Sequence, residues 1–309
     1  MRAVSVFAPA KVNLALHVTG RRADGYHLLD TLVAFAPAGD TLTLRPADAV
    51  SIAVAGPEAA GVPANRDNLA LRAAEIVLEG RGAALTLDKR LPPASGIGGG
   101  SSDAAAAVRG VLALRDPAAL DPGARPCAAM PEAALRRLAA LGADLPMCLC
   151  PAPLRARGIG ERLAFADLPP LPAVLVNPRV AVSTPAVFRA LARRENPPMP
   201  DILPAFAEAC AAIDWLKAQR NDMETAAMGL APQIGAVLAA LTAQPGCALA
   251  RMSGSGATCF GLFPTADEAR SAAARLGQDH PEWWVAGGVL GDQSEAARPR
   301  PVCPPGPAP

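Results

Sequence analysis

The sequence has no excess of charge of either sign, and it has few aromatic side chains. Its 309 residues include 29 Lys and Arg against 28 Asp and Glu, a formal net charge of +1, and aromatic residues make up 4% of the chain. Binding to nucleic acid requires a basic face that neutralises phosphates. The balanced charge therefore argues against nucleic acid as a partner.

The sequence also lacks a hydrophobic run long enough to cross a membrane, although 51% of its residues are hydrophobic. The longest uncharged stretch, residues 229–250, is interrupted by Pro232, Pro245 and several polar residues,. Near the N-terminus, Pro9 and Lys11 interrupt the apolar stretch before the core of a signal peptide is complete,. We therefore expect a cytosolic protein without an export signal or a membrane partner.

Cysteine and histidine offer little support for a metal site. The only close pair among the seven cysteines, Cys148 and Cys150, lacks the second ligand pair of a zinc site,. Free cysteine is among the most buried residue types. We expect these thiols to be part of the core.

The length of the chain favours two domains over a single core. Proline, glycine and arginine are concentrated in residues 151–172, and this shift in composition places a domain boundary near Gly160,. The prediction is an N-terminal domain over residues 1–160, a C-terminal domain over 161–291, and a disordered, proline-rich tail over 292–309.

Hydrophobic periodicity predicts a mixture of strands and helices. Residues 12–18 alternate between apolar and polar with the period of a half-buried strand, and residues 28–35 are expected to return as its antiparallel partner,. Thr265 and Glu268 have the spacing of a helix-capping box, and Gly142 is placed to end a helix in a left-handed cap. Further helices are predicted over 67–80, 103–114, 131–142 and 232–241, and further strands over 83–87, 174–176, 180–182, 259–263 and 284–290.

A glycine-rich loop precedes the alanine-rich helix predicted after Ser102. Glycines at a helix N-terminus expose backbone amides that bind phosphate, and the helix dipole adds to the attraction. The loop lacks the Gly-Lys-Ser/Thr of a Walker A motif and the third glycine of a dinucleotide fingerprint. On its own, the pattern leaves a capped structural turn as an even alternative. The loop consists of Pro92, Pro93, Ala94, Ser95, Gly96, Ile97, Gly98, Gly99, Gly100, Ser101 and Ser102.

The loop resembles the second signature of the GHMP kinases, and two other segments match that superfamily in the same order. These are residues 9–14 and the glycine-rich stretch 251–260. Within the superfamily, the chain resembles the kinases that phosphorylate 4-diphosphocytidyl-2-C-methyl-D-erythritol in non-mevalonate isoprenoid biosynthesis. The segments that carry this closer resemblance are 22–27, 141–146, 158–161, 220–224 and 183–185, the last leading to Phe188.

The resemblance implies a fold and a set of site residues. The fold is α+β, with a ribosomal protein S5 domain 2-like N-terminal domain, a ferredoxin-like C-terminal domain, and ATP and the substrate in the cleft between them. Asp144 is implied as the base that accepts the proton of the substrate hydroxyl, and Lys11 as the cation that keeps the carboxylate ionised and stabilises the transferred phosphoryl group. Without the resemblance, Lys11 would be taken for a solvated lysine and Asp144 for a turn residue.

The resemblance also implies how ATP, Mg²⁺ and the cytidine diphosphate substrate bind. Residues 92–102 are implied to bind ATP, Tyr26 and Phe188 to stack on the cytosine ring, and His27 to bond to its edge. Asn13, on the same strand face as Lys11, is expected to contact the substrate. No metal ligand can be assigned from the sequence. Homoserine, mevalonate or phosphomevalonate kinases and a non-catalytic nucleotide-binding regulator remain alternative functions.

Overall fold

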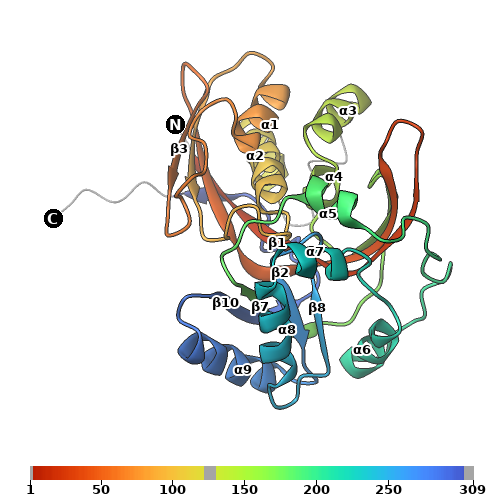
Figure 1. The fold of residues 1–309 in the computed structure, drawn as a ribbon. Helices are drawn as coiled ribbons and strands as arrows, with labels where there is room; N and C mark the ends of the chain where they lie inside the picture. The colour runs from red at the N-terminus through yellow and green to blue at the C-terminus, as the bar shows by residue number, and fades with distance from the viewer. Residues whose placement is uncertain (1–2, 122–129, 303–309) are drawn as a thin grey trace.

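The computed structural model describes residues 3–121 and 130–302, which form two β-sheets covered by helices. The larger sheet and its helices occupy the upper half of the molecule in Figure 1, and the smaller sheet with its helices occupies the lower half. The predicted α+β class is confirmed. Within the described ranges, no helix is long and apolar enough to cross a membrane.

The larger sheet has seven strands in the order β11-β1-β2-β4-β3, with β5 pairing to both β2 and β6. Among the described strands of this sheet, only β3 and β4 pair in parallel. The strands are β1 (Ala3–Arg21), β2 (His27–Pro46), β3 (Ser51–Ala55), β4 (Ala83–Asp88), β5 (Leu154–Gly158), β6 (Arg162–Phe165) and β11 (Arg300–Val302).

The first two strands form a long antiparallel hairpin, as the alternating pattern predicted. Lys11 pairs with Phe35, and Asn13 pairs with Val33. Three register shifts interrupt the pairing, and shifts of this kind are typical of β-bulges. The hairpin runs across the molecule to a projecting end in Figure 1, so its residues contact both halves.

Helices cover one face of the larger sheet, and the core between them is lined by alanine, valine and leucine. The predicted helices at 67–80, 103–114 and 131–142 are present within a few residues of their predicted bounds. Gly142 was predicted to adopt a left-handed cap, but its φ of 179° is extended, because the chain leads within two residues into the next helix. The elements are α1 (Leu69–Leu78), α2 (Gly99–Arg115), η1 (Pro117–Leu120), α3 (Glu132–Leu141) and α4 (Leu145–Leu149).

The smaller sheet is antiparallel, with the order β10-β7-β9-β8, and α8 and α9 pack on it. The predicted capping box of Thr265 and Glu268 is present at the start of α9. The strand predicted at 180–182 is wrong, because Arg179 has a left-handed φ of 58° that breaks the extended run. The strands are β7 (Leu171–Asn177), β8 (Leu249–Met252), β9 (Cys259–Leu262) and β10 (Trp284–Leu290). The helices are α5 (Thr184–Ala190), α6 (Ala209–Lys217), α7 (Glu224–Leu230), α8 (Gln233–Thr242) and α9 (Ala266–Asp279).

The structure differs from the predicted segmentation at two places. Gly160 lies in the turn between β5 and β6, and β6 still belongs to the larger sheet, so the chain changes sheets only after Phe165. The tail predicted to be disordered contains β11, which pairs with Ala3, Val4 and Ser5 of β1. That prediction is therefore wrong for 292–302, and residues 303–309 lie outside the described residues.

Candidate active site

The glycine-rich loop joins the start of α2 to the centre of β1. Gly98 precedes the helix with a left-handed φ of 62°, a conformation that favours glycine. The Ser102 hydroxyl donates to the carbonyl of Pro9 at 2.6 Å, and the Lys11 amide donates to the carbonyl of Ile97 at 2.9 Å. A Cβ on Gly98 would lie 3.1 Å from Lys11 Cε, so the lysine stem packs directly against the loop.

A second glycine-rich loop, residues 253–258 between β8 and β9, packs against the first. Its Ser253 hydroxyl donates to the carbonyl of Gly96 at 3.1 Å and accepts the amide of Asn13 at 3.0 Å. The Thr258 amide donates to the carbonyl of Ser95 at 3.0 Å. The three segments that resemble the GHMP signatures therefore meet at one place, although they are far apart in the sequence.

Lys11 and Asp144 meet beside this junction. The Lys11 ammonium lies 3.0 Å from the Asp144 carboxylate and donates to the side-chain carbonyl of Asn13, also at 3.0 Å. The Lys11 side chain is only 4% exposed, whereas that of Asp144 is 40% exposed. Asn13 in turn donates to the hydroxyl of Thr31 at 2.8 Å, which fixes its amide orientation. The arrangement presents an accessible carboxylate held by a buried cation.

A buried charge cluster lies under the first turn of α2. Lys89 donates to the carboxylates of Asp40 and Asp103, at 2.5 and 2.8 Å. Asp40 also accepts the amides of Arg90 and Leu91. Burial raises the pKa of Asp103 to about 8. The attraction of Lys89 opposes this shift, and the neighbouring Asp40 carboxylate adds to it. The cluster ties the strand before the glycine-rich loop to the helix that follows it.

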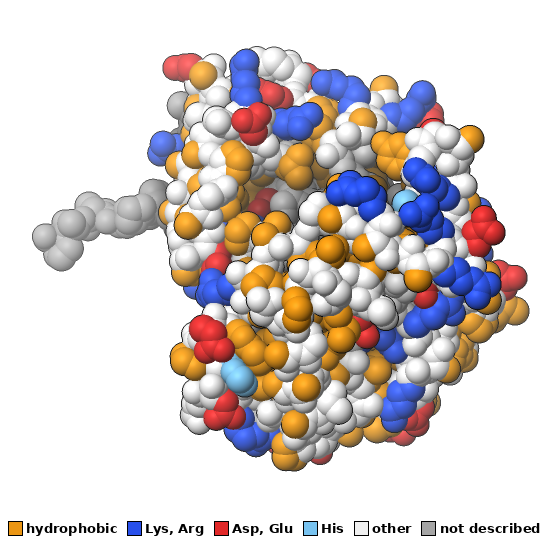
Figure 2. Space-filling view, viewed as in Figure 1, with side chains coloured by type: hydrophobic (Ala, Val, Ile, Leu, Met, Phe, Trp, Pro, Cys, Tyr) orange, Lys and Arg blue, Asp and Glu red, His pale blue; other side chains and the backbone are white. Residues whose placement is uncertain are grey.

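The residues expected to bind a base lie at the hairpin end, but only two of them meet. The rings of His27 and Phe188 stack with their centroids 4.2 Å apart and 10° between their planes. Tyr26 is 62% exposed and does not join the stack. Burial, and then the nearby charges of Arg21 and Arg194, lower the pKa of His27. Figure 2 shows Lys and Arg side chains gathered over this part of the visible face.

Neutral His27 has an unsatisfied ring nitrogen. Its Nε2 is buried and has no hydrogen-bond partner among the described residues. A neutral imidazole has one donor and one acceptor nitrogen, which is the pattern needed at the edge of a heterocyclic base. The role that the resemblance implies for His27 stays a prediction.

The structure offers no cage of protein ligands for a metal. Within 3–121 and 130–302, no group of three or more His, Cys, Asp or Glu side chains could hold an ion. Burial raises the pKa of the Cys148 thiol to about 12. Cys148 and Cys259 are buried, as predicted, whereas Cys210 is exposed, so the prediction of core thiols is wrong for Cys210. Mg²⁺ commonly keeps several waters and binds through substrate phosphates. A nucleotide-borne Mg²⁺ that touches one or two oxygen side chains is compatible with this site.

Several residues that build the site were given no structural role from the sequence, although they lie in segments that carry the resemblance. Asn221 donates to the carbonyls of Met252 and Gly254, at 2.8 and 2.9 Å, and Glu224 accepts the Met252 amide at 2.7 Å. The segment 220–224 thus supports the second glycine-rich loop, a role that its family-like pattern alone did not reveal. Thr184 and Ser255, whose hydroxyls lie 2.7 Å apart, join the start of α5 to the same loop.

Sequence comparisons agree with this geometry. The GHMP kinases N terminal domain family matches residues 47–150, and the GHMP kinases C terminal family matches 202–282. The 4-diphosphocytidyl-2-C-methyl-D-erythritol kinase of Roseobacter denitrificans is 55% identical, with 96% of this chain and 97% of that protein covered. The kinase of the same name from Dinoroseobacter shibae is 54% identical, with 94% and 96% covered.

Solved structures give the same result. A crystal structure of 4-(cytidine 5'-diphospho)-2C-methyl-D-erythritol kinase is 36% identical, with a TM-score of 0.72 and coverage of 93% of this chain and 99% of that one. Homoserine kinase from Cytophaga hutchinsonii, at 19% identity and a TM-score of 0.66 over 97% of both chains, shares the fold alone. The chain belongs to the 4-diphosphocytidyl-2-C-methyl-D-erythritol kinase family of GHMP kinases.

Proposed function

We propose that this protein transfers the γ-phosphoryl group of ATP to the 2-hydroxyl group of 4-diphosphocytidyl-2-C-methyl-D-erythritol, a step of non-mevalonate isoprenoid biosynthesis. The observation that carries the proposal is the 3.0 Å pair of Lys11 and Asp144 beside the glycine-rich loop. Phosphoryl transfer needs positioning and charge neutralisation more than covalent chemistry. A carboxylate and an ammonium beside a phosphate-binding loop supply both.

Each component has a distinct role in the proposed reaction. The amides of the loop 92–102 and the N-terminus of α2 bind the ATP phosphates. The Asp144 carboxylate accepts the proton of the substrate hydroxyl as the oxygen attacks the γ-phosphorus. The Lys11 ammonium holds that carboxylate in place and neutralises charge that develops on the phosphoryl oxygens. Asn13 orients Lys11 and has a remaining N–H for a substrate oxygen.

Cytosine recognition is assigned to the hairpin end. The exposed ring of Tyr26 and the face of Phe188 that does not stack on His27 are assigned to stacking on the base,, and His27 Nε2, which is unpartnered among the described residues, is assigned the hydrogen bond to the base edge. Because burial lowers the pKa of His27, the ring is neutral at pH 7 and can accept as well as donate,. These three side chains would select the cytidine compound over smaller alcohols.

The proposed co-substrate is ATP with Mg²⁺. Mg²⁺ would supply charge neutralisation on the phosphates, and the Ser101 hydroxyl and the accessible Asp144 carboxylate would hold it. Ser101 faces Gly142, two residues before Asp144, with its hydroxyl 3.7 Å from the place of a Cβ on that glycine. The Ser101 hydroxyl therefore lies beside the segment that leads to Asp144.

A panel of alcohols tests the proposal. ATP consumption by the purified protein is measured with 4-diphosphocytidyl-2-C-methyl-D-erythritol, mevalonate, homoserine and unsubstituted methylerythritol phosphate. The proposal predicts turnover with the cytidine compound only. Faster turnover with another alcohol would support kinase activity but refute the assignment of a cytosine pocket. ATP binding without turnover of any alcohol would favour a non-catalytic regulator.

A further inference from the structure

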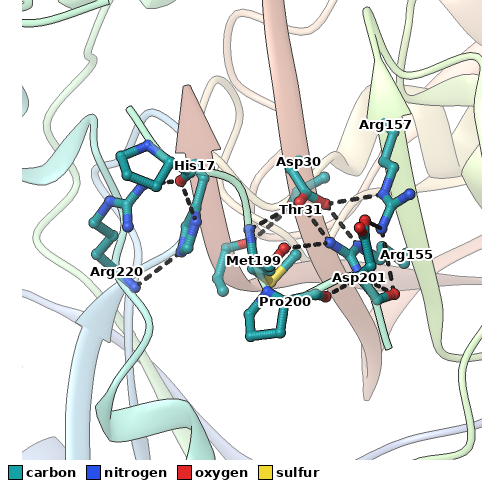
Figure 3. Close-up of polar contacts among 11 residues, drawn as sticks. His17, Asp30, Thr31, Arg155, Arg157, Met199, Pro200, Asp201 and Arg220 are labelled. Carbon is teal, nitrogen blue, oxygen red and sulfur yellow. Dashed lines mark hydrogen bonds and ion pairs between the residues drawn. The ribbon is translucent and has the colours of Figure 1, made fainter. Parts of the chain in front are cut away.

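A long connection without helix or strand, which we call the strap (residues 191–208), links α5 to α6. Connections of this length in a compact protein are uncommon and often functional. The strap begins directly after α5, which carries Phe188. Part of the strap lies across the hairpin strands and β5, where side chains of the sheet converge on it (Figure 3).

Asp30 of β2 and Arg155 of β5 form a buried ion pair beneath the strap. Arg155 donates from Nε to one carboxylate oxygen of Asp30 at 2.7 Å, and from Nη2 to the other at 2.6 Å. The Asp30 side chain is 3% exposed and that of Arg155 is 6% exposed. Two parallel bonds of this kind fix the guanidinium plane, which a lysine could not do.

The same two side chains bind the strap backbone (Figure 3). Arg155 donates to the carbonyls of Met199, Pro200 and Asp201, at 3.0, 2.7 and 3.0 Å. The second Asp30 oxygen accepts the amide of Met199 at 3.0 Å. The Met199 side chain is 1% exposed and packs in the core. One ion pair therefore satisfies four backbone groups of a segment that has no secondary structure of its own.

Contacts nearer to α5 extend this attachment along β1. The backbone amide of Asn196 donates to the carbonyl of Val18 at 3.1 Å. The His17 ring lies 3.2 Å from the carbonyl of Pro197, which also accepts from Arg220. His17 is the cross-strand partner of Asp30. Residues Asn196 to Asp201 of the strap are thus held against the sheet beside the hairpin, whose second strand, β2, starts at His27.

This attachment joins the two halves of the base pocket. His27 lies at the start of β2, three residues before Asp30, and Phe188 lies near the end of α5, three residues before the strap. The helix is short, and its direction depends on how its flanking segments are held. A buried ion pair contributes little stability compared with well-packed apolar residues. The role of this pair is therefore to fix the position of the strap backbone that it binds.

We propose that Asp30 and Arg155 are positioning residues for the base pocket: they hold the strap, and through it Phe188 of α5, in the place beside His27 from which the Phe188 ring stacks on cytosine. This inference rests on the proposed function, since it assigns a purpose to the same pocket. The pair touches neither ATP nor the reacting hydroxyl, so it acts on the affinity for the cytidine compound.

The first test compares Arg155→Lys with a matched control. Arg155→Lys keeps the positive charge but loses the two-nitrogen geometry of the guanidinium group. The control, Arg115→Lys, makes the same change at an arginine that binds the Val77 carbonyl and the Glu79 carboxylate near the C-terminal ends of α1 and α2. The KM for 4-diphosphocytidyl-2-C-methyl-D-erythritol should rise about tenfold in Arg155→Lys, which is the loss of affinity expected when one base–aromatic stacking contact is lost. The KM for ATP should stay within about twofold of wild type, and Arg115→Lys should change neither.

A second variant covers the case in which Arg155→Lys does not fold. Asp30→Asn/Arg155→Gln removes both charges together, so no unpaired charge is left buried. The same selective rise in KM is expected in this double variant. An equal rise in the KM values of both substrates, or no change in either, would overturn the inference.

A double-mutant cycle with Phe188→Leu tests the route of action. If Arg155 acts through Phe188, Arg155→Lys should raise the KM for the cytidine compound much less in the Phe188→Leu background than in wild type. Additive effects would overturn the inference. Absence of wild-type turnover with the cytidine compound would instead refute the proposed function, so the two failures are distinguishable.

Discussion

Replacement of Gly96 by alanine should separate the two glycine-rich loops. Gly96 has a left-handed φ of 77°, and an added Cβ would lie 2.6 Å from the carbonyl oxygen of Gly256 and 2.7 Å from that of Ser253. These are backbone atoms, so no side-chain rotation relieves the contact. Ordinary contact begins near 3.4 Å, and one loop must therefore move away from the other.

The expected cost combines two effects. A left-handed conformation costs a non-glycine residue about 1–2 kcal/mol, and overpacking of a filled site costs about 1–3 kcal/mol. The free energy of unfolding of Gly96→Ala should fall by about 2–5 kcal/mol. The KM for ATP should also rise, because the phosphate-binding amides move with the loop.

Urea unfolding and ATP kinetics measure both effects, with Gly100→Ala as the control. Gly100 lies in the same loop, but a Cβ there would meet only Leu69 Cδ1, at 3.5 Å. Alanine at this exposed helical position should leave stability unchanged or raise it by up to about 1 kcal/mol. A Gly96→Ala protein with wild-type stability and wild-type KM for ATP would refute the proposed packing of the loops.

Three further predictions concern charge and capping. Burial lowers the pKa of His27. The affinity for cytidine diphosphate, measured by calorimetry, should therefore be constant near neutral pH and fall as the pH drops through that lowered pKa. An affinity that does not change with pH would contradict the role of neutral His27. The pKa of Asp103 is raised to about 8, so the folded state binds the extra proton and wild-type stability should decline between about pH 4 and pH 8. Asp103→Asn should lack this decline in urea unfolding, and equal pH slopes would contradict the assignment. Thr265→Ala removes the capping box of α9 and should lower the free energy of unfolding by about 1 kcal/mol, whereas an unchanged value would show that the cap is unimportant.

Local patterns predicted the elements that depend on local physics. The hairpin of β1 and β2 follows from alternation, and the capping box of α9 follows from the spacing of Thr265 and Glu268. Both are set by neighbouring residues, so one sequence contains the information needed to predict them. The meeting of Lys11 with Asp144 is different, because it depends on how β1 packs against the start of α4. Only the resemblance to a family predicted that pair.

The parts that were missed depend on long-range pairing. Arg155 lies in a stretch rich in proline, glycine and arginine that suggested a domain boundary, yet pairing with β2 makes residues 154–158 a strand and places Arg155 beside Asp30. The proline-rich tail forms β11 at the edge of the larger sheet, and edge strands are where proline is tolerated in a sheet,. Neither outcome could be read from local composition, because the partner strand decides it.

The measurement that tests the central claim most directly is the activity of Asp144→Asn. Turnover of ATP with 4-diphosphocytidyl-2-C-methyl-D-erythritol is compared with that of wild type and of Asp267→Asn, which changes an exposed, ion-paired carboxylate far from the site on α9. We predict that kcat falls by about 10²–10⁴ in Asp144→Asn, while ATP and cytidine diphosphate still bind within a few-fold of wild type and Asp267→Asn is unaffected. Wild-type kcat in Asp144→Asn would contradict the assignment of Asp144 as the base.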